Sequence, residues 1–188
     1  SFESLVKPYL MEYPSHHRCL DEVGRNFPDF LQGLIQPGDP KFLPDLARAE
    51  WAKYCAEVTL TDVDTAAPPF PDLEDPASDS FRFTLNPSAE LFLSEWPVDR
   101  LLKHQPSIVF RQTVRLAIYL GKSHIQLDRL RSRQWELLQL IQCGSTLAAI
   151  GRWLKSERIK PAQYQKWISH WLECGLIQVS TQPLAQKR

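Results

Sequence analysis

The sequence has few of the residues that most catalytic motifs require. Its 188 residues include only seven glycines and four cysteines. There is no glycine-rich phosphate loop and no G-x-S-x-G motif, which argues against a nucleotide site and against a serine hydrolase. The cysteines Cys19, Cys55, Cys143 and Cys174 include no C-x-x-C pair, so neither a disulfide framework nor a zinc ribbon is indicated. We therefore expect reduced thiols in a cytoplasmic protein.

Long apolar runs are also missing. No stretch is apolar enough to predict a membrane span, and the first residues show no signal-peptide pattern. The hydrophobic fraction of 43% and the aromatic fraction of 11% are typical of a folded globular chain. The net charge is zero, but residues 1–80 hold 15 acidic and 6 basic residues, whereas residues 129–188 hold 3 and 10. This asymmetry indicates partner surfaces of opposite sign.

Helical patterns dominate the first part of the chain. Apolar residues recur at helical spacing from Phe2 to Tyr9, and a second short helix is expected from about residue 27, with Asn26 as its cap. A longer helix is predicted over 43–58. We expect its buried stripe to comprise Leu46, Ala49, Trp51 and Tyr54.

Residues 61–80 separate two expected domains. This stretch holds four prolines and six acidic residues with few apolar anchors, so it predicts a linker or a surface loop. We expect a helical N-terminal domain, including this linker, over 1–75. The second domain is expected over 80–188.

The second domain is expected to combine a small sheet with three helices. Alternating apolar patterns predict three strands of one antiparallel sheet, at 81–85, 108–120 and 123–127. A hairpin turn is expected at Gly121-Lys122. Three short helices follow, the last with Pro161 in its first turn and Gly175 at its end, and then a short strand over 176–180. The predicted fold class is α+β, with a C-terminal module that resembles a winged helix.

No histidine or cysteine cluster in the sequence predicts a metal or catalytic site. His16 and His17 point apart on any regular element, and only Glu12 and Asp21 lie near enough to extend such a site, so surface histidines are the preferred interpretation. A thiol enzyme that uses Cys19 beside these histidines stays an alternative. We expect no catalytic residue, no cofactor and no metal ion in this chain on its own.

A winged-helix module has two common uses. A DNA reader needs base-contacting side chains on its third helix, backed by lysines and arginines, but the expected outer face of that helix holds only Lys166 as a strong base. A peptide-capturing module needs an edge strand and an adjacent apolar groove. The candidate peptide-binding residues are Ser123, His124, Ile125, Gln126, Leu127, Tyr164, Trp167 and Trp171. For each tryptophan, burial in the core is the competing interpretation, and the more common one.

Four short motifs resemble one protein family. They are Phe27-Pro-Asp-Phe-Leu31, Phe42-Leu-Pro-Asp-Leu-Ala-Arg-Ala-Glu-Trp-Ala52, Leu85-Asn-Pro-Ser-Ala89 and Trp96-Pro-Val98. Over about residues 2–181 the chain resembles the HvfC-like proteins, a family formerly described as DNA-binding, which includes the small subunits of methanobactin-biosynthesis complexes. Broader members carry extra helices ahead of the segment that matches Phe2, and this favours the short branch.

The resemblance implies a partner subunit rather than an enzyme. Such subunits form a heterodimer with a TIM-barrel enzyme that holds a multinuclear non-haem iron centre. The pair uses O₂ to convert cysteines of a ribosomally made precursor peptide into oxazolone–thioamide groups. The iron ligands would belong to the partner, and the C-terminal half of this chain would bind the leader of the precursor as an added strand. The alternative is a winged-helix DNA-binding regulator, favoured by the basic charge of residues 129–188.

Overall fold

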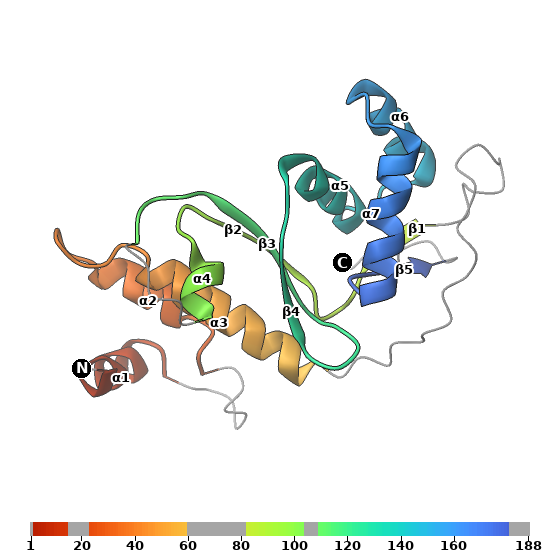
Figure 1. Cartoon of the computed structure of the whole chain (residues 1–188). Helices are drawn as coiled ribbons and strands as arrows, with labels where there is room; N and C mark the ends of the chain where they lie inside the picture. Colours follow the sequence, from red (N-terminus) through yellow and green to blue (C-terminus); the bar gives the residue numbers. More distant parts are fainter. Residues whose placement is uncertain (1, 15–22, 60–81, 104–108, 181–188) are drawn as a thin grey trace. The chain divides into compact units, whose positions relative to one another are not determined.

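A computed structural model describes most of the chain (Figure 1). The described ranges are 2–14, 23–59, 82–103 and 109–180. Within them the chain is a mixed α/β protein with seven helices and five strands. The strands form a three-stranded sheet and a separate two-stranded ribbon.

Two compact units make up the chain, and both are discontinuous in sequence. Unit 1 combines Ser1–Tyr54 with Leu93–Val114, and unit 2 combines Cys55–Phe92 with Arg115–Arg188. The predicted linker at 61–80 lies outside the described residues. The predicted split between 1–75 and 80–188 therefore stays a prediction.

Helices form most of unit 1. They are α1 (Phe2–Glu12), α2 (Phe27–Leu34), the greater part of α3 (Leu43–Val58) and α4 (Val98–Leu102). The helix predicted over 43–58 is confirmed at both ends. Tyr9 of α1 meets Phe27 and Phe30 of α2 edge-on, with ring centroids 5.3 Å apart in each pair. These aromatic contacts anchor α1 on α2.

The predicted buried stripe of α3 was only partly right. The face that the structure covers completely is made of small residues: Ala49, Ala52 and Ala56. Leu46, Trp51 and Tyr54 are half-buried. The sequence pattern favoured the large side chains, but alanines at a spacing of three and four residues share one helix face equally well.

The three-stranded sheet differs from the predicted one in the identity of one strand and in the starts of the other two. It consists of β2 (Glu90–Ser94), β3 (Val114–Leu120) and β4 (Ile125–Arg129), in the order β2-β3-β4. The segment predicted at 81–85 is not part of it. The strand predicted over 108–120 begins only at Val114, since residues 109–113 are not in a strand. The hairpin turn at Gly121-Lys122 is confirmed, but β4 begins two residues later than predicted. Ser123 and His124 therefore lie in the turn.

The displaced segment forms the two-stranded ribbon instead. β1 (Arg82–Leu85) pairs antiparallel with β5 (Ile177–Ser180), so that Arg82 lies opposite Ser180. A side-chain network holds this ribbon against its neighbours in unit 2. The buried Asn86 donates to Gly175 O over 2.8 Å and accepts from the backbone N–H of Ser88 over 2.9 Å. The Leu85–Ala89 motif therefore connects β1 to the end of the last helix.

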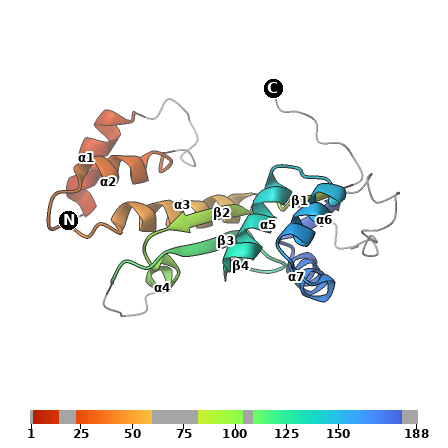
Figure 2. The ribbon, with the colours of Figure 1, turned by 90° about the horizontal axis from the view of Figure 1, so that it is seen from above.

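Three helices complete unit 2, as predicted (Figure 2). They are α5 (Ser132–Gln142), α6 (Leu147–Ser156) and α7 (Pro161–Cys174). Thr146 caps α6, because its hydroxyl accepts a hydrogen bond from Ala149 N over 3.2 Å. α7 ends at Gly175, whose φ of 81° is in the left-handed region that favours glycine.

These helices and β3 enclose the core of unit 2. The largest fully buried side chains of this core are Trp171, Tyr119, Tyr164, Phe83, Leu137, Leu138, Ile141, Leu147, Ile150 and Ile168. Residues 116–119 of β3 are all fully buried, so both faces of this strand are covered. None of the helices in the described ranges is long and apolar enough to span a membrane.

Candidate functional site

The strand β4 is the terminal strand of its sheet. Among the strands that the structure describes, β3 has a neighbour on each side, whereas β4 is paired with β3 alone. Among the described residues no other strand pairs with β4. A terminal strand leaves the backbone groups of its outer side without ladder partners, which makes it a site for strand addition.

Two hydrogen bonds fix which backbone groups of the hairpin point inward. Gly121 N donates to His124 O over 3.0 Å, and Leu130 N donates to Arg115 O over 2.8 Å. Both pairs agree with the register that places Leu120 opposite Ile125. In an antiparallel ladder every second pair exchanges hydrogen bonds. The bonded pairs of β4 are therefore those of its even-numbered residues.

Ile125 and Leu127 consequently direct their N–H and C=O groups away from β3. Gln126 and Asp128, between and after them, direct theirs toward β3. Leu120, which lies opposite Ile125 on β3, likewise directs its N–H away from the hairpin ladder. It donates to Ser88 Oγ over 2.9 Å. Within the described ranges neither Ile125 nor Leu127 has a backbone hydrogen bond to another element.

The predicted residues at the tip of the hairpin form a short polar chain. His124 lies 3.0 Å from Ser123 Oγ through its Nδ1 and 2.8 Å from Gln126 Nε2 through its Nε2. Ser123 and His124 are exposed. Their side chains are accessible, but they lie in the turn and add no backbone pairs to the edge.

The predicted groove wall on α7 is largely interior. Tyr164 is 0% exposed and Trp171 is 1% exposed, so both are core residues that an incoming peptide does not meet. Burial accordingly raises the pKa of the Tyr164 phenol above its ordinary value. Trp167 is half-buried and stacks on Trp171 with ring centroids 6.4 Å apart. Of the three aromatic candidates, Trp167 alone keeps an accessible surface.

A second group of polar side chains lies in unit 2, and the sequence did not predict it. Asp128 of β4 meets His170 and Cys174 of α7, and their potential ligand atoms all lie within 4.8 Å of one another. The Tyr119 hydroxyl lies 2.8 Å from Asp128 Oδ2 and 3.0 Å from Cys174 Sγ. Burial raises the pKa of Tyr119, and its hydrogen bonds to Cys174 and Asp128 raise it further. We call Asp128, His170 and Cys174 the polar cluster.

One signal for the polar cluster was present in the sequence. His170 and Cys174 are four residues apart, the spacing that places two side chains on one face of a helix. The sequence interpretation treated His170 as isolated, because the third member, Asp128, comes from a distant segment. Cys174 was considered only as a residue next to Gly175.

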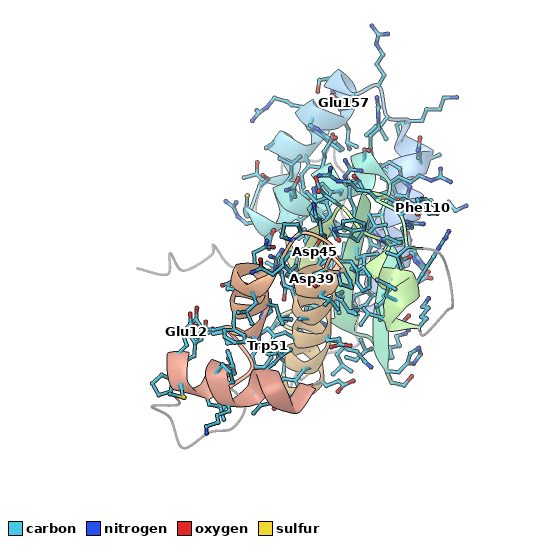
Figure 3. The ribbon with its side chains drawn as sticks, turned by 90° about the vertical axis from the view of Figure 1, so that its left-hand side faces the viewer. Glu12, Asp39, Asp45, Trp51, Phe110 and Glu157 are labelled. Carbon is cyan, nitrogen blue, oxygen red and sulfur yellow. The ribbon has the colours of Figure 1, made fainter. Side chains whose placement is uncertain are left out.

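Unit 1 contains an open cleft of about 580 Å³. It is lined by Gln32, Lys41, Asp45, Leu93, Ser94, Glu95, Trp96 and Arg111. Several of its polar groups already have partners. Ser94 Oγ donates a hydrogen bond of 2.5 Å to Asp45 of α3, which Figure 3 labels. Arg111 forms an ion pair with Glu95. Ser94 is also buried and accepts from Trp96 N over 3.0 Å, so it is a structural residue rather than a nucleophile.

The outer face of α7 gives little support to DNA reading. Its exposed side chains include Gln163, Gln165, Lys166, His170 and Glu173. The positive charge of Lys166 is offset by the negative charge of Glu173. Of the arginines before and within α5, Arg133 is paired with Glu157 over 3.3 Å. A helix that enters the major groove normally brings several free cations to the phosphates.

Several other candidates from the sequence lie outside the described residues. They are His16, His17, Cys19, Asp21 and His104. The alternative of a thiol enzyme based on Cys19 therefore stays a prediction. Comparison with known proteins adds no assignment, since no family model and no curated protein matches the chain.

Proposed function

We propose that this chain is a non-catalytic subunit that holds the leader of a ribosomally made precursor peptide for an iron oxygenase partner. In this role it would correspond to the small subunit of a methanobactin-biosynthesis complex, within the HvfC-like proteins. The observation that supports the proposal most directly is the outer side of β4. There the backbone groups of Ile125 and Leu127 point away from the sheet at its terminal strand.

Strand addition at this edge needs no particular side chain in the leader. Each backbone hydrogen bond that forms contributes about 0.5–1.5 kcal/mol net, so a short run of pairs gives useful affinity. Specificity would come from side chains. Ile125 and Leu127 share one face of the sheet, and both are half-buried, so apolar leader residues at alternate positions can cover what remains exposed.

The proposal treats the β3–β4 hairpin and α5–α7 as one winged-helix-like peptide recognition element. The resemblance to the HvfC-like proteins supports this arrangement, since its motif Leu85–Ala89 contains the buried Asn86 that links β1 to the end of α7. In this element β4 is the recognition edge. The helices supply the core that keeps the edge in place.

Unit 1 would then supply the surface that docks on the TIM-barrel partner. Several of its large apolar side chains are exposed, among them Met11 at 75%, Leu93 at 51% and Phe110 at 57%. Figure 3 labels Phe110. The partner would provide the iron, its ligands and the oxygen chemistry, and the heterodimer would work in the cytoplasm. This chain would provide binding alone.

The test is a titration of a fluorescein-labelled methanobactin precursor leader with this chain and with its complex. We expect saturable binding in both cases. If neither the chain alone nor its complex binds the leader, the proposal is contradicted.

A proline scan of β4 locates the binding edge. Leu127→Pro removes an outward N–H and no bond to β3, so it should weaken leader binding at least tenfold while the chain stays folded. Leu127→Ala is the matched control, because it shortens the side chain and keeps the N–H. Gln126→Pro removes a bond to β3 and should instead destabilise the fold by about 1–3 kcal/mol, because a ladder acceptor loses its partner. Equal leader affinities for Leu127→Pro and Leu127→Ala would show that β4 does not pair with the leader.

The basic segment 129–188 favours one second candidate, a DNA-binding regulator. That function predicts duplex binding that weakens steeply as salt is added. Absence of a mobility shift with micromolar duplex at low salt would eliminate it.

A further inference from the structure

The polar cluster brings an oxygen, a nitrogen and a sulfur donor together from two elements. His170 and Cys174 lie one turn apart on α7, on the side that faces β4. Asp128 projects from β4 on the face that it shares with Tyr119 of β3. Asp128 and Cys174 are half-buried, and His170 is exposed.

The distances within the cluster suit a small cation after a modest closure. The donor atoms lie within 4.8 Å of one another. Around a tetrahedral Zn²⁺, with bonds of about 2.0–2.3 Å, ligand atoms lie about 3.3–3.7 Å apart. The closure needed is therefore at most about 1.5 Å. Because His170 is exposed, its side chain can move toward a bound ion without disturbing the core.

The donor types select the class of metal. A thiolate and an imidazole exclude Ca²⁺ and Mg²⁺, which take oxygen ligands. Sulfur, nitrogen and carboxylate oxygen together are ligands of Zn²⁺ and of divalent ions that substitute for it. Three protein ligands leave a fourth position, which at the solvent-exposed His170 is open to water.

Tyr119 provides the outer support that such a site needs. Its hydroxyl has one proton but lies within hydrogen-bond distance of two acceptors, Asp128 Oδ2 at 2.8 Å and Cys174 Sγ at 3.0 Å. It can satisfy only one of them fully. A cation bound to both acceptors resolves this competition, because the Tyr119 hydroxyl can then donate to one metal-bound atom, Asp128 Oδ2 or Cys174 Sγ, and fix its orientation.

We propose that Asp128, His170 and Cys174 form a binding site for one Zn²⁺-class ion, with water as the fourth ligand. On binding, Cys174 releases its thiol proton to solvent and the thiolate bonds to the metal. The ion joins β4 to α7 and so stabilises unit 2. The site is distinct from the proposed leader edge, because it uses side chains on the inner face of β4 and not the outward backbone of Ile125 and Leu127.

The test uses the full chain with Co²⁺ as a spectroscopic probe and Zn²⁺ as the competitor. We expect one equivalent of Co²⁺ to give a sulfur-to-cobalt charge-transfer absorption with tetrahedral d–d bands, and Zn²⁺ to displace it. Cys174→Ala should abolish the charge-transfer absorption. Cys143→Ala, which removes an exposed thiol outside the cluster, should leave it unchanged.

Two further variants separate ligand loss from misfolding. His170→Gln alters an exposed side chain, so the metal-free unfolding midpoint should stay the same while the Co²⁺ affinity falls at least tenfold. Tyr119→Phe keeps the buried ring and should weaken Co²⁺ binding by about 10–100-fold. The proposal is overturned if the parent chain gives no charge-transfer absorption, if Cys174→Ala retains it, or if His170→Gln binds Co²⁺ as tightly as the parent.

Discussion

The two strands of the β3–β4 hairpin show how the same local structure can be enclosed in the fold or left open to a partner. β3 has a strand on each side and four consecutive fully buried residues, from Leu116 to Tyr119. β4 has one neighbour among the described strands, and its residues 125–128 are half-buried. β3 therefore contributes stability, whereas the exposed backbone of β4 contributes a surface. The difference predicts that substitutions in the two strands will affect different measurements.

The largest expected effect extends this comparison to the paired tryptophans of α7. Trp171→Ala should lower the free energy of unfolding by about 3–5 kcal/mol, because it empties a fully buried volume. Trp167→Ala should cost clearly less, since that ring is only half-buried, and should instead weaken leader binding. Urea denaturation followed by far-ultraviolet circular dichroism measures both. Equal losses of stability would show that Trp167 also belongs to the closed core.

Ile118 and Leu127 allow the most direct comparison of the two strands, because they lie opposite each other in the ladder. Ile118→Ala should destabilise the chain by about 2–4 kcal/mol. Leu127→Ala should cost about 1 kcal/mol, since its side chain is only half-buried. The same urea experiment applies. A cost at Leu127 equal to that at Ile118 would mean that β4 contributes as much to the stability of the fold as β3 does.

Asn86 supports the covered side of β3. It bonds to Gly175 O and to Ser88, whose hydroxyl in turn accepts from Leu120 N. Asn86→Ala should destabilise the chain by about 2–3 kcal/mol, because its buried partners lose their hydrogen bonds. Gln139→Ala, at an exposed helix position, is the control and should stay within about 0.5 kcal/mol. An Asn86→Ala midpoint that matches the control would show that the network is not needed.

The smallest expected effect concerns pH. Burial raises the pKa of Tyr119 of β3, so the folded chain keeps a phenol proton that the unfolded chain releases above about pH 10. Stability should be fully present below that pH and should fall above it, with Tyr119 contributing about 1.4 kcal/mol per pH unit and the buried Tyr164 a similar amount. Tyr119→Phe should reduce this slope. Unfolding curves from pH 9 to 11 measure it, and a parental slope in Tyr119→Phe would contradict the assignment.

The helices could be predicted from the sequence because their signals are local. The bounds of α3 follow from its turn residues and apolar spacing, and the end of α7 follows from Gly175. The sheet could be predicted only in part. The segment 82–85 is a strand, but its partner β5 lies almost a hundred residues away, and local alternation contains no information about that pairing.

The candidate site divides in the same way. The edge strand was predicted because a hairpin with polar turn residues is a local pattern. Its predicted start was two residues too early, because Ser123 and His124 belong to the turn. Burial of Tyr164 and Trp171 could not be separated from groove lining, because both roles require the same apolar residues on one helix face. The polar cluster was missed since Asp128 joins His170 and Cys174 only in the folded chain.

Amide hydrogen exchange of β4, measured residue by residue by NMR, tests the central claim most directly. In the free chain the amides of Gln126 and Asp128 should be protected by β3, and those of Ile125 and Leu127 should exchange rapidly. Saturation with the leader peptide should slow exchange at Ile125 and Leu127 selectively. Protection of these two amides in the free chain, or their unchanged exchange in the saturated complex, would contradict the account.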